Sequence, residues 1–176
     1  TKFQIYVIAR KDGGISSVDD LRDKGVDFSD PLSTTTVYGM HLLAQRNETF
    51  GTFFKRAIYS GSHDMTIELV ANGTVDAGFI DGHIWDYHEA VSPAHSSRTK
   101  VIHRSPDFTI PPVVVPKGMD PGTKRRIREI LLLMHEDAEG GAILRKLRIE
   151  RFIPVEDADY RNLYQMVETV NEQLGK

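Results

Sequence analysis

The stretch Phe28-Ser29-Asp30-Pro31-Leu32-Ser33-Thr34-Thr35-Thr36 determines the fold that the sequence predicts. It lies between a short apolar segment, Val26–Phe28, and a segment with helical apolar periodicity, Val37–Ala44. This order predicts a strand, a turn that contains proline, and a helix. The first turn of a helix has unpaired N–H groups and a partial positive charge, and Ser33, Thr34 and Thr35 add hydroxyl groups beside them. The stretch therefore predicts a cradle for an oxyanion, although such residues are also typical of simple helix capping.

A second polar turn has the same design. The turn Ser60-Gly61-Ser62-His63-Asp64 follows the predicted strand Phe54–Tyr59 and opens a predicted helix that ends near Ala71. In open α/β sheets, ligands bind at the carboxyl ends of the strands, where such helices begin. We therefore expect His63 to contact the oxyanion, with a polar residue at a helix start as the simpler alternative. An imidazolium contact would make binding weaken as the pH rises past a pKa of about 6.5.

Asp81 follows another predicted strand, Val75–Ile80, and lies at the start of the next predicted helix. Two roles are open for it: capping that helix, or contacting the ligand or the opposing lobe. Asp30-Pro31, by contrast, is typical of turn chemistry, since an aspartate that faced an anion would repel it.

Strands and helices alternate along the chain, which predicts an α/β fold with a mainly parallel sheet and helices on both faces. The expected strands are Phe3–Ala9, Val26–Phe28, Phe54–Tyr59, Val75–Ile80, Lys100–Arg104, Val113–Val115 and Phe152–Pro154. The expected helices are a short one after Ser17, then Ser33–Arg46, His63–Ala71, His83–Ala90, Asp120–His135, Ala138–Leu147 and Tyr160–Leu174. On the helix Ser33–Arg46, we expect the buried stripe to consist of Val37, Met40, His41 and Ala44.

The composition excludes several classes of function. The chain has 176 residues, of which 40% are hydrophobic and 27% charged, and its formal net charge is −3. No basic surface indicates binding to nucleic acid or anionic lipid, and no apolar run reaches the length of a membrane span. Cysteine is absent, which excludes disulfides, thiol catalysis and cysteine-ligated metal. No cofactor is predicted.

Metal binding and catalysis are the remaining alternatives for the polar residues. His83, Asp86 and His88 could suggest a metal, but two histidines five positions apart share one helix face poorly. A Ser33–His63–acid grouping could suggest a hydrolase, but Ser33 lies in a hydroxyl cluster and not in a glycine-flanked nucleophile elbow. Neither metal binding nor catalysis is therefore the favoured interpretation.

Several blocks of the sequence carry a family resemblance. Ser17-Val18-Asp19-Asp20-Leu21-Arg22, followed by Phe28–Thr34, resembles a stretch of the phosphonate-type periplasmic binding proteins, which capture substrate for phosphate, phosphite and phosphonate ABC importers. Gly61–Asp64 and Val70–Gly78 are similar to the next two blocks of that family, in the same order. Ser105–Pro112 resembles the segment by which the chain returns to the first lobe.

The resemblance implies a periplasmic binding protein-like fold, with one complete lobe and the C-terminal part of the other. Residues 1–9 would form a crossing strand, residues 10–103 the second α/β ligand-binding lobe, and residues 104–176 the return segment and the C-terminal part of the first lobe. Most of the N-terminal lobe of the family has no counterpart in this chain.

The resemblance also implies the ligand contacts. Ser33, Thr34 and Thr35 match the hydroxyl groups that bind the phosphonate oxygens, His63 matches an oxyanion-contacting histidine, and Asp81 matches an acid at the cleft. The sequence departs from the family pattern in two places. Thr36 replaces a glycine and could narrow the cradle, and the segment 109–111 lacks the acid that holds the ammonium group of an aminoalkylphosphonate. This second departure disfavours an amino-bearing ligand.

The implied function is capture of a small oxyanion by the solute-binding component of an ABC importer, in the periplasm or another extracytoplasmic space. Its partners would be the oxyanion and a membrane permease, with self-association as one way to complete the cleft. The alternatives are the ligand-sensing domain of a signalling receptor with the same fold and, third, a hydrolase that uses the same pocket.

Overall fold

The computed structural model describes residues 2–175, which form two compact units. One unit contains the residues up to Ile110 together with those from Tyr160 onward, and the other is Pro111–Asp159. The predicted division at residues 103 and 104 concerns the lobes of a complete clamp and stays a prediction. Each compact unit is described here by itself.

The first unit is built on a five-stranded sheet with the strand order β4-β3-β5-β2-β6. The strands are β2 (Ile5–Arg10), β3 (Gly25–Phe28), β4 (Arg56–Tyr59), β5 (Ala77–Asp81) and β6 (Thr99–Arg104). Strand β3 pairs in parallel with β4 and β5, whereas β2 pairs antiparallel with β5 and β6. Four strands therefore share one direction and β2 opposes them, which refines the predicted, mainly parallel sheet.

A second, two-stranded sheet lies beside the first. It pairs β1 (Lys2–Phe3) antiparallel with β7 (Phe108–Thr109), with Phe3 opposite Phe108. The predicted strand Phe3–Ala9 is thus divided between β1 and β2 at Gln4. The outgoing and returning segments of this unit therefore run side by side, and their role as crossing strands between two lobes stays a prediction.

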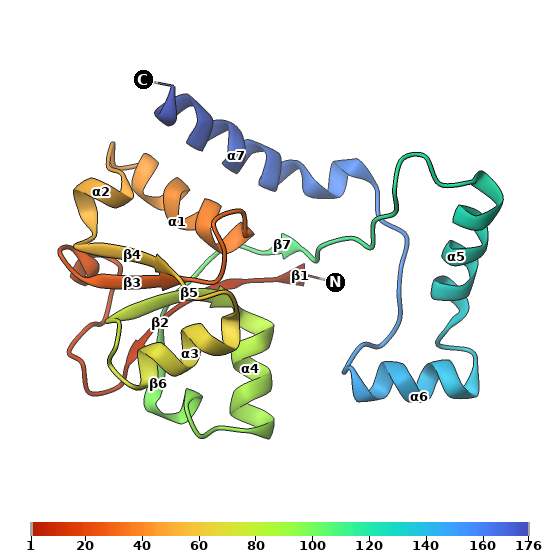
Figure 1. Cartoon of the computed structure of the whole chain (residues 1–176), viewed down its shortest axis with the longest axis horizontal. Helices are drawn as coiled ribbons and strands as arrows, with labels where there is room; N and C mark the ends of the chain where they lie inside the picture. Colours follow the sequence, from red (N-terminus) through yellow and green to blue (C-terminus); the bar gives the residue numbers. More distant parts are fainter. Residues whose placement is uncertain (1, 176) are drawn as a thin grey trace. The chain divides into compact units, whose positions relative to one another are not determined.

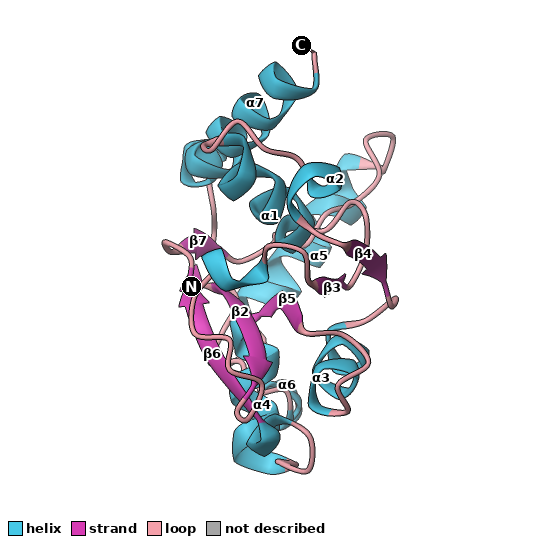
Figure 2. Ribbon diagram, turned by 90° about the vertical axis from the view of Figure 1, so that its left-hand side faces the viewer, coloured by secondary structure: helices cyan, strands magenta, loops and turns pink. Residues whose placement is uncertain are grey.

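Helices cover both faces of the five-stranded sheet, as the sequence predicted (Figures 1 and 2). One face carries α1 (Thr34–Ala44), α2 (Phe50–Phe53) and α7 (Arg161–Leu174). The other carries α3 (His63–Ala71) and α4 (Gly82–Val91). The described residues also form three short 3-10 helices, η1 (Asp19–Leu21), η2 (Ser96–Arg98) and η3 (Asp157–Tyr160).

Strand alternation divides the core into two clusters. Val26 and Phe28 face the first cluster, where the Phe28 ring stacks on Phe50 and Phe79 with a centroid distance of 4.7 Å in both pairs. The second cluster gathers Ile67, Ile80 and their neighbours beneath α3. The helix α2 occupies a segment outside the helices that the sequence predicted, and a reciprocal hydrogen-bond pair between Thr49 and Thr52 caps it.

The predicted buried stripe of α1 is wrong. Val37, Met40, His41 and Ala44 are only half-buried. The buried residues are Thr35, Thr36, Tyr38, Gly39 and Leu43. The reason is that α1 contacts the sheet on one side and α7 on another, so its apolar side chains are divided between two partners. A single-stripe pattern does not describe a helix covered in this way.

The second unit contains α5 (Pro121–Leu133) and α6 (Ala138–Lys146). The strands predicted at Val113–Val115 and Phe152–Pro154 are wrong, because both segments are irregular and partly or fully exposed, with no strand beside them to complete a ladder. Helix α5 contains no buried residue in the described structure. The large apolar side chains Ile130, Leu133, Ile143 and Leu147 are all at least 43% exposed, which is typical of a surface that contacts another polypeptide.

None of the helices within residues 2–175 has both the length and the apolar character that crossing a membrane requires.

Close packing between α3 and the sheet yields a stability prediction. A Cβ atom at Gly78 would overlap the methyl group of Thr66 and lie 3.2 Å from Val70 Cγ2. We expect Gly78→Ala to lower the free energy of unfolding in urea by about 1–3 kcal/mol, as other overpacked cores do. Gly118→Ala is the control, since no heavy atom lies within 4 Å of its added Cβ, and it should change stability by less than about 0.5 kcal/mol. Equal stability of the two variants would contradict this account of the packing.

Candidate functional site

Three helices begin at one edge of the sheet. Strands β4, β3 and β5 lie side by side and parallel, and each leads directly into a helix, namely α3, α1 and α4. Backbone hydrogen bonds join the two polar turns: Ser60 N donates to Phe28 O at 3.1 Å, and Gly61 N donates to Ser29 O at 2.8 Å. The sheet therefore brings the two turns together at the edge where the sequence placed them.

Ser33 is the N-cap of α1, so the capping role is confirmed. Its Oγ accepts a hydrogen bond from Thr36 N at 3.2 Å and lies 2.7 Å from Thr35 Oγ1. Asp30 forms the turn before it, where Oδ1 accepts from Leu32 N at 2.7 Å, which confirms the predicted turn chemistry. Capping occupies an acceptor site of Ser33 Oγ, and its proton remains available to Thr35 or to an anion.

The three threonines after Ser33 differ in their surroundings. Thr34 is half-buried, and within residues 2–175 its hydroxyl pairs with no other group. Thr35 is buried and shares its hydroxyl with Ser33. Thr36 is fully buried and donates its hydroxyl proton to Asp30 O at 2.6 Å. Thr34 is consequently the hydroxyl of this cluster that a ligand could use without breaking an internal bond.

His63 is the first residue of α3 and is half-buried. In the part of the chain that the structure describes, its buried Nδ1 has no hydrogen-bond partner. Burial lowers the pKa of His63, while the nearby carboxylates of Asp81, Asp64 and Asp27 act to raise it. The imidazole is thus a polar group with an unused nitrogen, placed at a helix start among acids.

Asp81 is half-buried and caps α4, since its Oδ1 accepts from His83 N at 2.8 Å. The capping role that the sequence left open is therefore present. Its carboxylate also acts to raise the pKa of His63, which indicates that the two side chains lie near each other at this edge of the sheet. Its contact with a ligand stays a prediction, as do the contacts of Ser33, Thr34, Thr35 and His63.

The sequence analysis missed a buried acid beneath this edge. Asp27 lies in β3 with 0% of its surface exposed. Its Oδ2 accepts hydrogen bonds from Ser60 Oγ at 2.7 Å and from Thr66 Oγ1 at 2.5 Å. Burial raises the pKa of Asp27, against hydrogen bonds from Thr66 and Ser60 that act to lower it. The one available signal was an acid between Val26 and Phe28 in an otherwise apolar strand.

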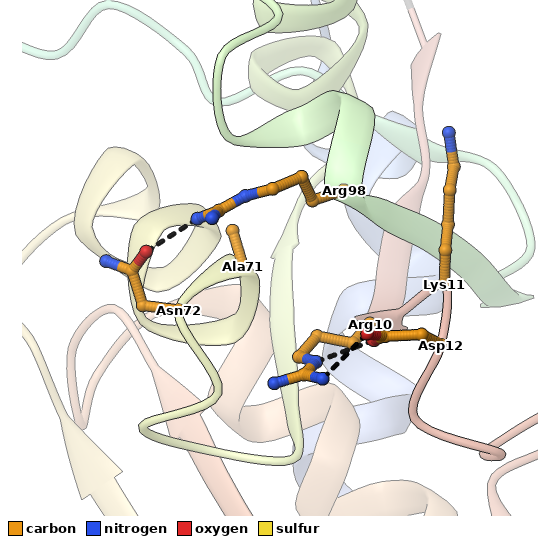
Figure 3. A pocket seen from close by; sticks show the side chains of 6 residues that line it. All are labelled: Arg10, Lys11, Asp12, Ala71, Asn72 and Arg98. Carbon is orange, nitrogen blue, oxygen red and sulfur yellow. Dashed lines mark hydrogen bonds and ion pairs between the residues drawn. The ribbon is translucent and has the colours of Figure 1, made fainter.

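A pocket of about 450 Å³ lies at the other end of the sheet, where α3 ends and β6 begins (Figure 3). Its two guanidinium groups already have partners in the chain. Arg10 binds Asp12 through two hydrogen bonds of 2.8 Å, and Arg98 donates to Asn72 Oδ1 at 2.5 Å. This pocket is therefore separate from the predicted oxyanion cradle.

The suggested metal ligands are not gathered into a site. His88 Nε2 lies 2.6 Å from Asp64 Oδ1, and Asp86 accepts from the Tyr6 hydroxyl at 3.2 Å. Over residues 2–175, no three His, Asp or Glu side chains are grouped so that they could hold a metal ion.

Known proteins share this fold. The structure of PhnD1 from Prochlorococcus marinus in complex with methylphosphonate matches 97% of this chain and 67% of its own, with a TM-score of 0.81 and 23% identity. A binding protein component of an ABC phosphonate transporter from Pseudomonas aeruginosa matches 98% of this chain and 59% of its own, with a TM-score of 0.82 and 23% identity. The fold is therefore that of a periplasmic binding protein.

Comparison of sequences defines the family. The model of the ABC transporter phosphonate periplasmic substrate-binding proteins matches residues 1–160. The phosphonates-binding periplasmic protein of Escherichia coli is 29% identical over 147 residues, and the phosphite binding protein PhnD1 of Prochlorococcus marinus is 26% identical over 127 residues. The match to the Escherichia coli protein spans 80% of this chain and 43% of that protein. The match to the Prochlorococcus marinus protein spans 69% of this chain and 41% of that protein. The chain belongs to the family of phosphonate ABC transporter periplasmic substrate-binding proteins.

The cap at Ser33 yields a stability prediction. We expect Ser33→Ala to lower the free energy of unfolding by about 1 kcal/mol, since Thr36 N loses its acceptor. Ser33→Asp keeps an acceptor at this helix start and should retain nearly all of the stability. Urea denaturation of both variants is the measurement, and an equal loss in the two would contradict a capping role.

Burial of Asp27 yields a pH prediction. Its pKa in the folded protein is raised above the ordinary value of 3.8, so the folded state favours the neutral carboxyl. The stability that this preference contributes is complete below that ordinary value and is lost as the pH rises through the raised pKa. The stability of Asp27→Asn relative to wild type should therefore increase as the pH rises from the ordinary value through the raised pKa of Asp27. A pH-independent difference in urea denaturation would contradict the raised pKa.

Proposed function

We propose that this protein is the solute-binding component of an ABC importer and captures a small oxyanion of the phosphonate, phosphite or phosphate class. The proposal rests on a single observation. Two helix starts, which carry hydroxyl groups and a histidine, lie together at one edge of the sheet, and backbone hydrogen bonds from Ser60 and Gly61 join their turns. Membership of the substrate-binding family supports it. The relatives named for phosphite and phosphonates support this ligand class.

The proposed ligand contacts are neutral donors and helix starts. Ser33, Thr34 and Thr35 offer hydroxyl groups, His63 offers a ring nitrogen, and the first turns of α1 and α3 offer backbone N–H groups. Each hydrogen bond to a charged group contributes about 1.5–3 kcal/mol, and a helix start adds about 0.3–1 kcal/mol for an anion. A few such contacts reach the roughly 8 kcal/mol of micromolar binding after the costs of association.

Asp81 would set the selectivity of this site. Its carboxylate lies near His63 at the sheet edge and disfavours a second negative charge beside it. A tetrahedral ligand with a small or apolar substituent therefore fits this arrangement better than a ligand that carries an additional carboxylate group. An amino-bearing ligand remains disfavoured by the absence of an acid at residues 109–111.

The proposed partners follow from the proposed role. A membrane permease would receive the ligand, and the site of action would be the periplasm or another extracytoplasmic space. The protein would carry out no chemistry on its ligand. Self-association, as one way to complete the cleft, also stays a proposal, and analytical ultracentrifugation with and without methylphosphonate would test it.

A ligand panel tests the function. We expect phosphate, phosphite or methylphosphonate to raise the Tm of the protein and to bind in calorimetry, because the donors match a tetrahedral oxyanion. The panel also contains sulfate, 2-aminoethylphosphonate, a sulfonate and a dicarboxylate. A response to the sulfonate or the dicarboxylate alone would contradict the phosphorus assignment, and no response from a folded protein would contradict oxyanion capture.

Two substitutions locate the site. Thr34→Val removes a hydroxyl without breaking an internal bond and should weaken binding about tenfold to a hundredfold. Thr169→Val on α7 is its control and should leave the affinity unchanged. His63→Gln should weaken binding. If the imidazolium form contacts the anion, the substitution should also remove the loss of affinity that we expect of wild type as the pH rises through the pKa of His63. Calorimetry that found Thr34→Val and Thr169→Val alike would place the ligand elsewhere.

A further inference from the structure

The buried carboxylate of Asp27 lies beneath the proposed site and has no role in it so far. Val26 and Phe28 face the core under α1, so the alternation of β3 places Asp27 on the face that α3 covers. Its surface is fully buried, and within residues 2–175 its Oδ1 has no hydrogen-bond partner. A buried carboxylate with an unpartnered oxygen is destabilising, so its presence here calls for an explanation.

Its second oxygen joins three elements. Oδ2 accepts from Ser60 in the turn after β4 and from Thr66 in α3, at 2.7 Å and 2.5 Å. Each hydroxyl has one proton, and its alternative acceptors are farther away: Ser62 O lies 3.3 Å from Ser60 Oγ and 3.1 Å from Thr66 Oγ1, and the two hydroxyl oxygens are 3.4 Å apart. The shorter distances direct both protons to Asp27, so one carboxylate fixes both the turn and the helix.

Packing on the neighbouring strand leaves little room for α3 to move. Asp27 is in register with Gly78 of β5, and a Cβ atom at Gly78 would overlap the methyl group of Thr66. Thr66 is therefore held by its methyl group against the sheet and by its hydroxyl on Asp27. His63 lies one helical turn before Thr66, so the anchor acts directly beneath the start of α3.

Three carboxylates from three elements act on His63. They are Asp27 on β3, Asp64 on α3 and Asp81 at the start of α4. Asp64 is paired with His88 of α4, and Asp81 accepts from His83 N. Asp27 is the member of this set that is fully buried, and its Oδ2 accepts from the hydroxyl groups of Ser60 and Thr66.

We propose that Asp27 is a positioning residue of the oxyanion site, which fixes through Ser60 and Thr66 the turn and helix start that present His63 to the ligand. This inference rests on the proposed function. Two effects of the carboxylate oppose each other. Its charge repels an anion, so a purely electrostatic role predicts tighter binding when the charge is removed. Its anchoring of the turn predicts weaker binding, and the structure favours anchoring, because the donors on both sides converge on one oxygen.

The test compares Asp27→Asn with Asp76→Asn. The first substitution is isosteric and removes the buried charge. The second removes the carboxylate of Asp76, which lies outside β3 and accepts a hydrogen bond from Gly25 N at the opposite end of that strand. We expect Asp27→Asn to weaken methylphosphonate binding about tenfold or more, as loss of a supporting residue does at other sites, and Asp76→Asn to leave the affinity unchanged. Unchanged or tighter binding in a folded Asp27→Asn protein would overturn the proposal.

A second readout needs no ligand. Where Asp27 is ionised in wild type, NMR titration of the His63 ring in the free protein should give a lower pKa in Asp27→Asn than in wild type, because the nearby negative charge is lost. Asp76→Asn should leave the titration unchanged. If wild type binds none of the anions, the proposed function fails, while this titration still supports or contradicts the coupling of Asp27 to His63. A lower Tm with unchanged titration and affinity would make Asp27 merely structural and overturn the proposal.

Thr66 supplies a second pair of variants in case Asp27→Asn does not fold. Thr66→Val keeps the shape of the side chain and removes the donor, whereas Thr66→Ser keeps the donor and removes the methyl group. We expect Thr66→Val to weaken methylphosphonate binding and Thr66→Ser to retain most of it. The opposite order would show that packing alone positions α3 and would overturn the role of the carboxylate.

Discussion

Parallel pairing of β3 with β4 and β5 is the constraint on which the rest of the first unit depends. Because the three strands are neighbours and share a direction, the helices that follow them begin at one edge. The backbone bonds from Ser60 and Gly61 to the end of β3 then fix the distance between the two polar turns. A reversal of one of these strands would move a helix start to the opposite edge and divide the candidate site.

Two residues at this edge have structural roles as helix caps. Ser33 caps α1 by accepting from Thr36 N, and Asp81 caps α4 by accepting from His83 N. Burial lowers the pKa of His63 and raises the pKa of Asp27, so it favours the neutral form of both groups. The electrostatic effect of each group on the pKa of the other is opposite in direction. The edge is polar and mixed in burial: Asp27 and Thr35 are buried, whereas Ser33, Thr34, His63 and Asp81 are only half-buried.

The two units differ in how they bury apolar surface. The first has cores on both faces of its sheet. The second presents Ile130, Leu133 and Ile143 around a largely apolar pocket of about 500 Å³. The chain matches 41–43% of the length of its curated relatives. The family relationship therefore assigns a class to the chain, while substrate and partners remain proposals that rest on the geometry of the first unit.

The sequence by itself determined the family, the alternation of strands and helices, and, to within one residue, the helix starts that the structure has at Thr34, His63 and Gly82. Those features are local, because caps, turns and periodicity act over a few residues. Tertiary structure decided the antiparallel insertion of β2, the buried face of α1 and the role of Asp27. Each depends on contacts between distant segments: α7 covers α1, and Thr66 meets Asp27 only after α3 packs across β3 and β5. No local pattern specifies which distant partner a side chain will find.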